Sequence, residues 1–458
     1  MHAQILRLVP VAALLGAAAC RESPTDTRYA APAFKAAGNQ SADPGQKGPF
    51  EAGFTHFVIH DANRDNRPIA ISVWYPVDHA SIGASATPAR YPLDAFTGTL
   101  PLATSTDFEA FGIDRAYQEP PASRGPYPLV IFSPGFGDTF DQYAYVGARL
   151  ATHGIVVGIL THWGDGYSGS PGEPVDAVEV VGYNRPRDMS RALDALLDRS
   201  SMEGDLLDGT IDPQRVAASG HSIGGYATMV LAGGDDLVCD MLDASTAPPS
   251  TCVPSLPDPR FGSIVTVDGS NGFLRFYELA RVHVPAMGIG SDSARTAVAM
   301  AILWRQHAAF SGHPNYRVDV HNPVADPMAY HMAFSSVCAS LGVYQKYPEM
   351  AQLWLPSFQF WLDWWCPPEA LPPQEMHRRV TKYMISFLET DQPVLAPGYA
   401  ITSEPGVAFF VTEPGNPRAT GVDDPTYAYF IGQPGAATAQ AAKDPPHPAP
   451  VRLGLRRH

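Results

Sequence analysis

Short, uninterrupted apolar runs alternate along this chain with segments of helical period, and this alternation limits the possible folds more than any other feature. Apolar runs of strand length occur at 128–132 (PLVIF), 154–160 (GIVVGIL) and 263–267 (SIVTV). Such runs are typical of strands buried on both faces, as in parallel sheets. Between them, segments such as 185–200 and 375–389 place their apolar side chains on one helical face. The sequence therefore predicts an α/β fold, with a doubly wound, mostly parallel sheet and flanking helices.

The charge balance of the chain bears on its partners. The 458 residues include 46 acidic and 31 basic side chains, which gives a formal net charge of −15. A protein that binds nucleic acid usually presents a basic face, so we predict no nucleic-acid partner.

The N-terminal residues 1–20, MHAQILRLVPVAALLGAAAC, are predicted to be a signal peptide. Their apolar run is too short to span a bilayer and ends in small residues. The ending at Cys20 resembles a bacterial lipoprotein cleavage site, although that class usually has leucine where Ala17 stands. We predict export, with Cys20 lipidated and the protein held at a membrane surface as an outer-membrane or cell-surface lipoprotein. The alternative is an ordinary periplasmic or secreted protein. Residues 21–48 have the composition of a flexible tether.

The cysteines agree with export. Of five cysteines, four remain once Cys20 is assigned to a lipid, and an even number suits an oxidising compartment. Cys239 and Cys252 bracket a proline-rich segment and are predicted to pair, which leaves Cys338 and Cys366 for a second disulfide. The alternative is four buried free thiols. No cysteine or histidine cluster has the spacing of metal ligands, so we predict no metal site.

One serine is surrounded by glycines in the segment 215–234, RVAASGHSIGGYATMVLAGG. Ser222 lies in a G-x-S-x-G pattern, between an apolar run and a helical segment. This context fits a nucleophile elbow, in which the serine occupies a strained turn and the flanking glycines, Gly220 and Gly224, let the backbone pass closely. The alternative is a glycine-rich strand–helix junction without chemistry.

A second glycine-rich loop, GDGYSG at 164–169, fits the G-x-G-x-x-G pattern of dinucleotide sites. That pattern requires a strand directly before it and a helix directly after it. Pro171 and Pro174 stand where the helix should begin, so we interpret the loop as a surface turn and predict no cofactor.

A serine nucleophile needs a base and an acid, which in such folds follow in the order Ser, Asp or Glu, His. His321 and His331 both lie after the strand predicted at 316–320, and His321 directly abuts that strand. Asp268 and Asp292 each follow a predicted strand, at the edge where α/β sheets build their sites. The residues alone leave both choices open.

Several segments in order resemble the plasma-type platelet-activating-factor acetylhydrolases and their bacterial lipase-like relatives, a family of α/β-hydrolases. They are GPFEAGFTHF, IAISVWYP, VIFSPGFGD, NRPRDMSRALDAL, VAASGHSIGGYA, VTVDGSNGF and HMAFSSVC, between residues 49 and 390. The resemblance implies an α/β-hydrolase domain over 49–390, with Asp268 of VDG as the acid and His331 of HMAF as the base. It also implies an oxyanion hole made by the backbone N–H groups of Phe136 and Ile223.

Two further regions complete the predicted organisation. The aromatic segment 352–366, QLWLPSFQFWLDWWC, is interpreted as a helix over the sheet or as an apolar wall for a lipid-like or aromatic ester. Residues 391–433 are predicted to be a C-terminal extension with a small β element, and 434–458 a disordered tail.

Together these features predict an exported serine ester hydrolase that acts through an acyl-enzyme on a small-molecule, lipid or polymer ester. The ester would have a lipid-like, short or medium acyl part, or belong to a polyester. The alternatives are an acyltransferase or peptidase on the same fold, or a non-catalytic lipoprotein that binds ligands. An intact Ser, Asp and His set argues against the last of these.

Overall fold

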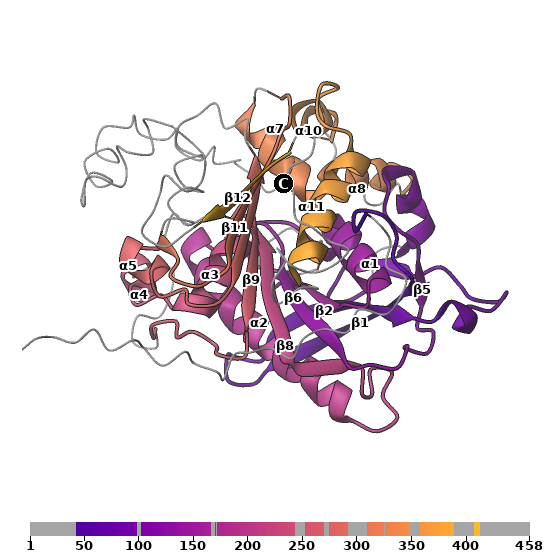
Figure 1. Cartoon of the computed structure of the whole chain (residues 1–458), viewed down its shortest axis with the longest axis horizontal. Helices are drawn as coiled ribbons and strands as arrows, with labels where there is room; N and C mark the ends of the chain where they lie inside the picture. The colour runs from indigo at the N-terminus through magenta and orange to yellow at the C-terminus, as the bar shows by residue number, and fades with distance from the viewer. Residues whose placement is uncertain are drawn as a thin grey trace, which may run out of the picture. The chain divides into compact units, whose positions relative to one another are not determined.

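The apolar runs form strands of one ten-stranded sheet in the computed structural model (Figure 1). The structure describes residues 43–98, 102–165, 170, 172–242, 252–269, 274–291, 309–324, 326–347, 358–388 and 407–412. The predicted signal peptide with Cys20, the alternative acid Asp292 and the predicted tail lie outside the described residues.

The order of the strands in the sheet is β12-β11-β10-β9-β8-β6-β7-β2-β1-β5. The neighbours from β11 through β6 to β7 all run parallel, whereas β2 is antiparallel to both β7 and β1. The strands are β1 (Glu51–Asp61), β2 (Arg67–Val77), β5 (Ala116–Gln118), β6 (Tyr127–Ser133), β7 (Val156–His162), β8 (Ile211–His221), β9 (Ser263–Val267), β10 (Ala286–Ser291), β11 (Asn315–Val320) and β12 (Val407–Thr412), with β3 (Arg90–Pro92) and β4 (Leu102–Thr104) in a separate small sheet. The predicted doubly wound, mostly parallel sheet is thus confirmed.

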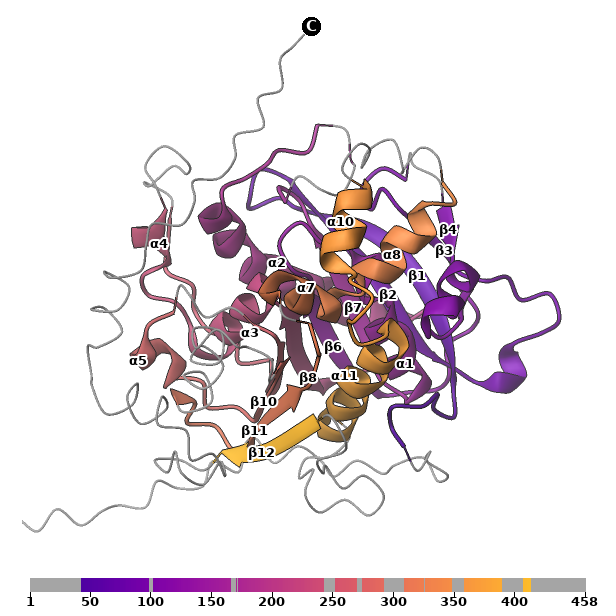
Figure 2. The ribbon, with the colours of Figure 1, turned by 90° about the horizontal axis from the view of Figure 1, so that it is seen from above.

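Helices cover both faces of the sheet (Figures 1 and 2). They are α1 (Ala144–Thr152), α2 (Val178–Ser201), α3 (Ile223–Gly233), α4 (Val238–Met241), α5 (Phe276–Leu279), α7 (Pro327–Met332), α8 (Val337–Tyr344), α10 (Phe358–Trp365) and α11 (Pro373–Leu388). The two faces are built by alternation along each strand: in β6, Val130 and Phe132 join the core with α1, α8 and α11, while Leu129 and Ile131 join the core with α2 and α3. Both faces of the strand are buried, which explains its uninterrupted apolar sequence.

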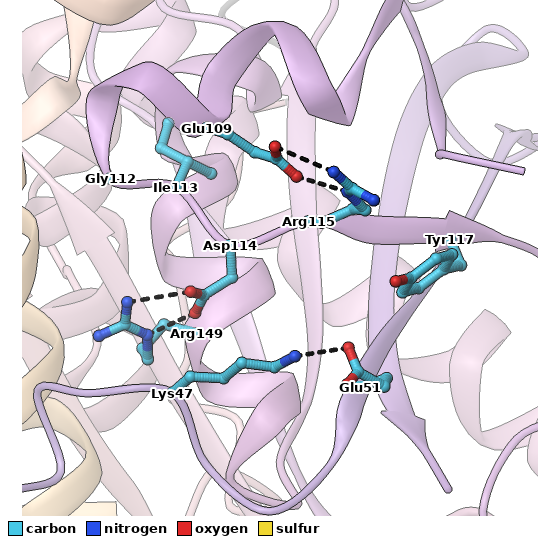
Figure 3. Close-up of a pocket in the computed structure, with 9 residues that line it drawn as sticks. All are labelled: Lys47, Glu51, Glu109, Gly112, Ile113, Asp114, Arg115, Tyr117 and Arg149. Carbon is cyan, nitrogen blue, oxygen red and sulfur yellow. Dashed lines mark hydrogen bonds and ion pairs between the residues drawn. The ribbon is translucent and has the colours of Figure 1, made fainter. Parts of the chain in front are cut away.

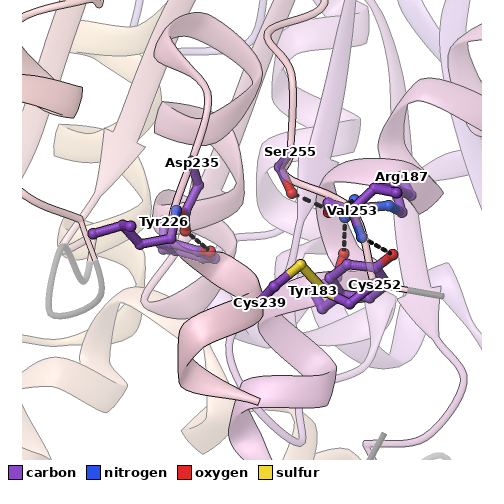
Figure 4. The surroundings of a disulfide bond; sticks show 9 residues. Tyr183, Arg187, Tyr226, Asp235, Cys239, Cys252, Val253 and Ser255 are labelled. Atoms are coloured by element: carbon purple, nitrogen blue, oxygen red, sulfur yellow. Dashed lines mark hydrogen bonds between the residues drawn. A yellow bond between two sulfur atoms is a disulfide. The ribbon is translucent and has the colours of Figure 1, made fainter. Parts of the chain in front are cut away.

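Both predicted disulfides are present. Cys239 of α4 pairs with Cys252, and Cys338 of α8 pairs with Cys366, directly after α10. Just after Cys252, the chain contacts α2, where Arg187 donates hydrogen bonds to Val253 O and Ser255 Oγ, both at 2.9 Å (Figure 4). The second joins α8 to the residue after α10, and both helices lie between β11 and β12 in sequence.

Two segments that flank the predicted domain contact it. The last six residues of the predicted tether, 43–48, contact the domain: His153 Nε2 lies 2.8 Å from Gln46 O, and Gly48 N–H donates to Thr152 Oγ1 at 2.9 Å. At the other end, β12 lies beyond residue 390 and pairs antiparallel with β11 as an edge strand of the main sheet. Within the described residues, no helix combines the length and the apolar character needed to cross a bilayer.

Candidate active site

Ser222 sits on a strained turn between the end of β8 and the start of α3. Its backbone has φ 53° and ψ −121°, a conformation that costs free energy for a residue with a side chain. The flanking glycines are required by space. A Cβ at Gly220 would lie 2.4 Å from the backbone of Gly224, and a Cβ at Gly224 would lie 2.0 Å from Ser133 O. The local geometry is therefore that of a nucleophile elbow.

Asp268 lies at the same edge of the sheet as Ser222. It directly follows β9, the strand next to β8, and Ser222 N–H donates to Val267 O at 3.1 Å. Asp268 also has a positive φ, of 41°, and its N–H donates to Ile289 O at 2.6 Å. These backbone hydrogen bonds fix the turn that carries the carboxylate beside the turn that carries the serine.

His331, in α7, reaches the carboxylate of Asp268. The distance between His331 Nδ1 and Asp268 Oδ2 is 2.5 Å, and the two residues are 63 positions apart in the sequence. Burial alone would lower the pKa of His331, but the hydrogen bond to Asp268 and its negative charge raise that pKa above the ordinary value of 6.5. With Nδ1 held by Asp268, Nε2 is the ring nitrogen that can accept a proton from a nucleophile.

The alternative base, His321, lies apart from Asp268 and His331, and the alternative acid, Asp292, is not described by the structure. His321 directly follows β11, is exposed, and accepts a hydrogen bond from Arg379 through its backbone oxygen at 3.5 Å. Among the described residues it does not join the cluster formed by His221, Asp268 and His331, whose polar atoms lie within 4.8 Å of one another. Asp292 lies outside the described residues, so the structure does not compare it with Asp268.

The loop after β6, SPGFGD at 133–138, faces the start of α3. Arg185 of α2 donates hydrogen bonds to Pro134 O and, at 2.7 Å, to Gly135 O. Because the C=O and N–H of a trans peptide point in opposite directions, holding Gly135 O toward Arg185 directs the N–H of Phe136 away from it. Phe136 itself is 40% exposed. Ile223 is the first residue of α3, so its N–H belongs to a helix N-terminus.

A buried ionic network supports this loop from below. Arg185 pairs with Asp165, which accepts the Gly137 N–H at 3.3 Å. His162 bridges Ser133 Oγ and Asp188 Oδ2, with both distances 2.9 Å. Burial alone would raise the pKa of Asp188, but the charges of Arg67 and Arg64 and the contact with His162 lower it well below its usual range.

Sequence reasoning did not single out these supporting residues. Asp165 falls in the glycine-rich loop interpreted as a surface turn, yet it is buried, and Arg185 and Asp188 lie in a segment used only to predict a helix and to support the family resemblance. The available signal was that Arg185 and Asp188 stand in a helix next to residues that form the core. Charged residues buried in this way require partners, so they indicate an ionic network.

His221, Asp268 and His331 could also offer ligand atoms to a metal ion. Both ring nitrogens of His221 are already engaged, however: Nδ1 with the Tyr143 hydroxyl at 2.7 Å and Nε2 with the backbone oxygen of His331 at 3.1 Å. Coordination of an ion by His221 would therefore break one of these hydrogen bonds. The arrangement fits an acid–base pair better than a metal site.

The segment predicted to be either a helix over the sheet or an apolar wall contains the helix α10, which packs against α7 and α8. Trp364 Nε1 donates to Asp326 Oδ2 at 3.2 Å, just before α7 begins. On the outer side of the helix, Phe360 is 58% exposed and its ring centroid lies 5.5 Å from that of Trp364. An exposed aromatic pair thus lies on a helix that contacts the helix of His331. Trp354 and the side chain of Trp361 lie outside the described part of the chain.

A separate pocket of about 420 Å³ has charged walls (Figure 3). Each of three basic residues pairs with an acidic one across it: Lys47 with Glu51, Arg115 with Glu109, and Arg149 with Asp114, at 2.5–2.6 Å. The full lining is Lys47, Glu51, Glu109, Gly112, Ile113, Asp114, Arg115, Tyr117 and Arg149. The formal charges cancel and the lining includes none of the predicted catalytic residues, so we assign no reaction to this pocket.

Comparison with known proteins agrees with this architecture. The sequence profile of the family "Platelet-activating factor acetylhydrolase, isoform II" matches residues 36–168, a span that includes Phe136 but ends before Ser222. Cutinase 1 of Thermobifida cellulosilytica is 30% identical over 114 residues, which are 24% of this chain and 37% of the cutinase. A bis(hydroxyethyl) terephthalate hydrolase of Streptomyces coelicolor is 29% identical over 149 residues, which are 32% of this chain and 42% of that enzyme.

The chain thus spans between about a third and two-fifths of the length of these curated relatives. A solved structure covers more: that of a ferulic acid esterase from Streptomyces cinnamoneus superposes with a TM-score of 0.50 and 21% identity, over 81% of this chain and 99% of the esterase. At this level of identity the likeness concerns the fold. The protein therefore has an α/β-hydrolase fold and, over residues 36–168, resembles the isoform II platelet-activating factor acetylhydrolases.

Proposed function

We propose that the protein is a serine hydrolase that cleaves carboxylic esters through an acyl-enzyme. The observation that carries the proposal is the hydrogen bond between Asp268 and His331, at the sheet edge where Ser222 occupies the strained turn. The names of the relatives support the reaction class, because cutinases, a bis(hydroxyethyl) terephthalate hydrolase and a ferulic acid esterase all act on esters.

In the proposed reaction, Ser222 Oγ attacks the ester carbonyl carbon while its proton passes to His331 Nε2. The carbonyl oxygen becomes an oxyanion that accepts hydrogen bonds from the N–H groups of Phe136 and Ile223. Collapse of this intermediate breaks the ester bond, and the leaving alcohol takes the proton from His331. Water then attacks the acyl-enzyme with His331 again as base, which releases the carboxylic acid and restores Ser222. Asp268 stabilises the imidazolium at both stages.

Hydrolysis of a series of p-nitrophenyl esters from acetate to palmitate, together with bis(hydroxyethyl) terephthalate and methyl ferulate, tests this function. We expect turnover of at least one short or medium acyl ester, insensitive to EDTA, because the chemistry requires only the serine, the base and backbone donors. A binding protein would show no turnover above a buffer control. Strong inhibition by EDTA, reversed by a divalent metal, would instead favour a metal site at His221, Asp268 and His331.

We further propose export, with Cys20 lipidated and the enzyme anchored at a membrane surface. Two disulfides support an oxidising compartment, because such bonds persist outside the reducing cytosol. In a bacterial host, radiolabelled palmitate should enter the wild-type protein and should not enter Cys20→Ala. Export without labelling would favour ordinary secretion, and retention of the wild type in the cytosol would contradict export itself.

A further inference from the structure

Beneath the proposed catalytic residues, two buried side chains join three parts of the site that are distant in sequence. Tyr143 and His221 are 0% and 1% exposed. The Tyr143 hydroxyl accepts the Gly135 N–H at 3.1 Å and lies 2.7 Å from His221 Nδ1. His221 Nε2 lies 3.1 Å from His331 O. A continuous path of hydrogen bonds therefore runs from the loop at 133–138 to His331. We call this loop the oxyanion loop, after the proposed donor Phe136.

We propose that Tyr143 and His221 are positioning residues, which hold the oxyanion loop and the base in register with the nucleophile. This proposal rests on the proposed function. Neither side chain is placed to contact the substrate; each acts through a backbone group of a neighbour, Tyr143 through Gly135 N–H and His221 through His331 O.

The hydrogen-bond roles follow from the partners. The carbonyl of His331 can only accept, so Nε2 of His221 carries a hydrogen. Burial, followed by the charge of nearby His331, lowers the pKa of His221, so the ring is neutral and Nδ1 accepts. The Tyr143 hydroxyl donates to Asp138 Oδ2 at 2.5 Å, and His221 Nδ1, at 2.7 Å, is a second acceptor beside the same hydroxyl.

The loop is held from two sides as a result. Tyr143 fixes the Gly135 N–H, and Arg185 fixes the Gly135 carbonyl, so the peptides on either side of Gly135 are both held. The second of these peptides contains the N–H of Phe136, one of the two proposed oxyanion donors. Gly135 also packs closely against this network, since a Cβ at this position would lie 2.4 Å from Asp138 Oδ2 and 3.0 Å from His221 Nδ1.

His221 connects this loop to the other half of the site. It directly precedes Ser222, and its ring centroid lies 4.4 Å from that of His331. Burying a phenol and an imidazole costs free energy unless both are hydrogen-bonded, and apolar residues of similar size would fill the same space more favourably. Retaining polar groups here is consistent with a role in geometry, because a satisfied buried network selects one arrangement.

Tyr143→Phe tests the proposal because it removes one oxygen and keeps the ring. A misplacement of about 1 Å in a reacting geometry can cost about 10²-fold in rate, so we expect kcat on the preferred p-nitrophenyl ester to fall by about 10- to 100-fold. KM should change by less than about threefold, since substrate contacts are kept. Affinity for an alkyl trifluoromethyl ketone, which forms an oxyanion on the serine, should weaken in parallel with kcat.

Tyr75→Phe is the matched control. Tyr75 lies on β2, is equally buried, and its hydroxyl donates to Pro120 O at 2.8 Å. His221→Gln and His221→Leu complete the test. The glutamine amide can replace the Nε2 donor to His331 O, so the Gln variant should keep more kcat than the Leu variant. Rates are expressed per active site, titrated with a fluorophosphonate, so that misfolded protein does not count.

Three outcomes would overturn the proposal. One is a Tyr143→Phe variant with kcat within about twofold of Tyr75→Phe. Another is equal kcat in His221→Gln and His221→Leu. The third is a variant in which fewer active sites react with the fluorophosphonate but kcat per titrated site equals that of the wild type. If wild-type protein hydrolyses no ester in the panel, the proposed function fails first and this role fails with it, which separates the two cases.

Discussion

Replacement of Ser222 by alanine should abolish ester hydrolysis while leaving the fold intact. Loss of a serine nucleophile of this kind lowers kcat by about 10⁶-fold, so the residual rate should approach that of the buffer. The turn itself should persist, because Gly220 and Gly224 create the space for it and alanine is no larger than serine. The measurements are kcat on the preferred p-nitrophenyl ester and the thermal midpoint of unfolding.

Ser219→Ala is the matched control for this substitution. Ser219 lies three residues earlier on β8, is fully buried, and its hydroxyl has no hydrogen-bond partner within the described part of the chain. Removing an unpaired buried hydroxyl should not reduce stability or kcat. A fluorophosphonate should label the wild type and Ser219→Ala at Ser222 and should not label Ser222→Ala. Labelling of a different serine, or full activity in Ser222→Ala, would refute the assignment.

Asp268→Asn should lower kcat by about 10⁴-fold, which is the second largest effect we expect. The amide keeps the size of the side chain but removes the charge that stabilises a protonated His331. It can also turn its NH2 group toward Nδ1, and this group cannot accept a hydrogen bond from Nδ1–H. Asp292→Asn is the comparison, because the sequence offers Asp292 as the alternative acid. We expect Asp292→Asn to cost at most a modest factor. A large loss in Asp292→Asn with a small one in Asp268→Asn would move the acid to Asp292.

The pH dependence provides a second measurement on the same variant. Burial alone would lower the pKa of His331, but Asp268 raises it above 6.5 through its hydrogen bond and charge. His331 must be neutral to act as a base, so the acidic limb of kcat/KM in the wild type should lie above pH 6.5. In Asp268→Asn the limb should move to lower pH, because both effects of Asp268 are lost while burial still lowers the pKa of His331, opposed by the charge of Asp138. An unchanged limb would show that Asp268 does not control this titration.

The same shift has the opposite consequence for stability. A group whose pKa is raised by folding stabilises the folded state fully below its unfolded pKa. This contribution of His331 is therefore present below pH 6.5 and is lost as the pH rises through the raised value. Activity and this part of the stability should change in opposite directions over one pH range.

Much of the fold was predictable because the signals are local. The runs at 128–132 and 263–267 correspond to β6 and β9, and the helical segment at 185–200 lies within α2. Each follows from the period with which apolar side chains recur, and that period depends on neighbouring residues alone. The elbow at Ser222 was predictable from the local G-x-S-x-G pattern, since a Cβ at Gly220 would meet Gly224, but the space at Gly224 is limited by Ser133 O, which is distant in sequence.

The acid and the base were not determined by such signals. Residue patterns left His321 beside His331 and Asp292 beside Asp268, and the preference for Asp268 and His331 came from the family resemblance. Only the folded chain brings Asp268 within 2.5 Å of His331, because that contact requires β9 to lie next to β8 and α7 to pack across the ends of the strands. Their catalytic roles stay proposals until the variants are measured.

The sequence by itself indicated the central strands of the sheet, helices such as α2 and α11, the two cysteine pairs and the serine on its turn. Tertiary structure alone decided which buried polar groups meet: Tyr143 with His221, and Arg185 with Asp165 beneath the oxyanion loop. A buried polar side chain must find a partner, but its own sequence neighbours do not specify which one. The partner depends on how α2, β7 and the loop after β6 pack together, and residues 78 positions apart, such as Tyr143 and His221, meet only once that packing exists.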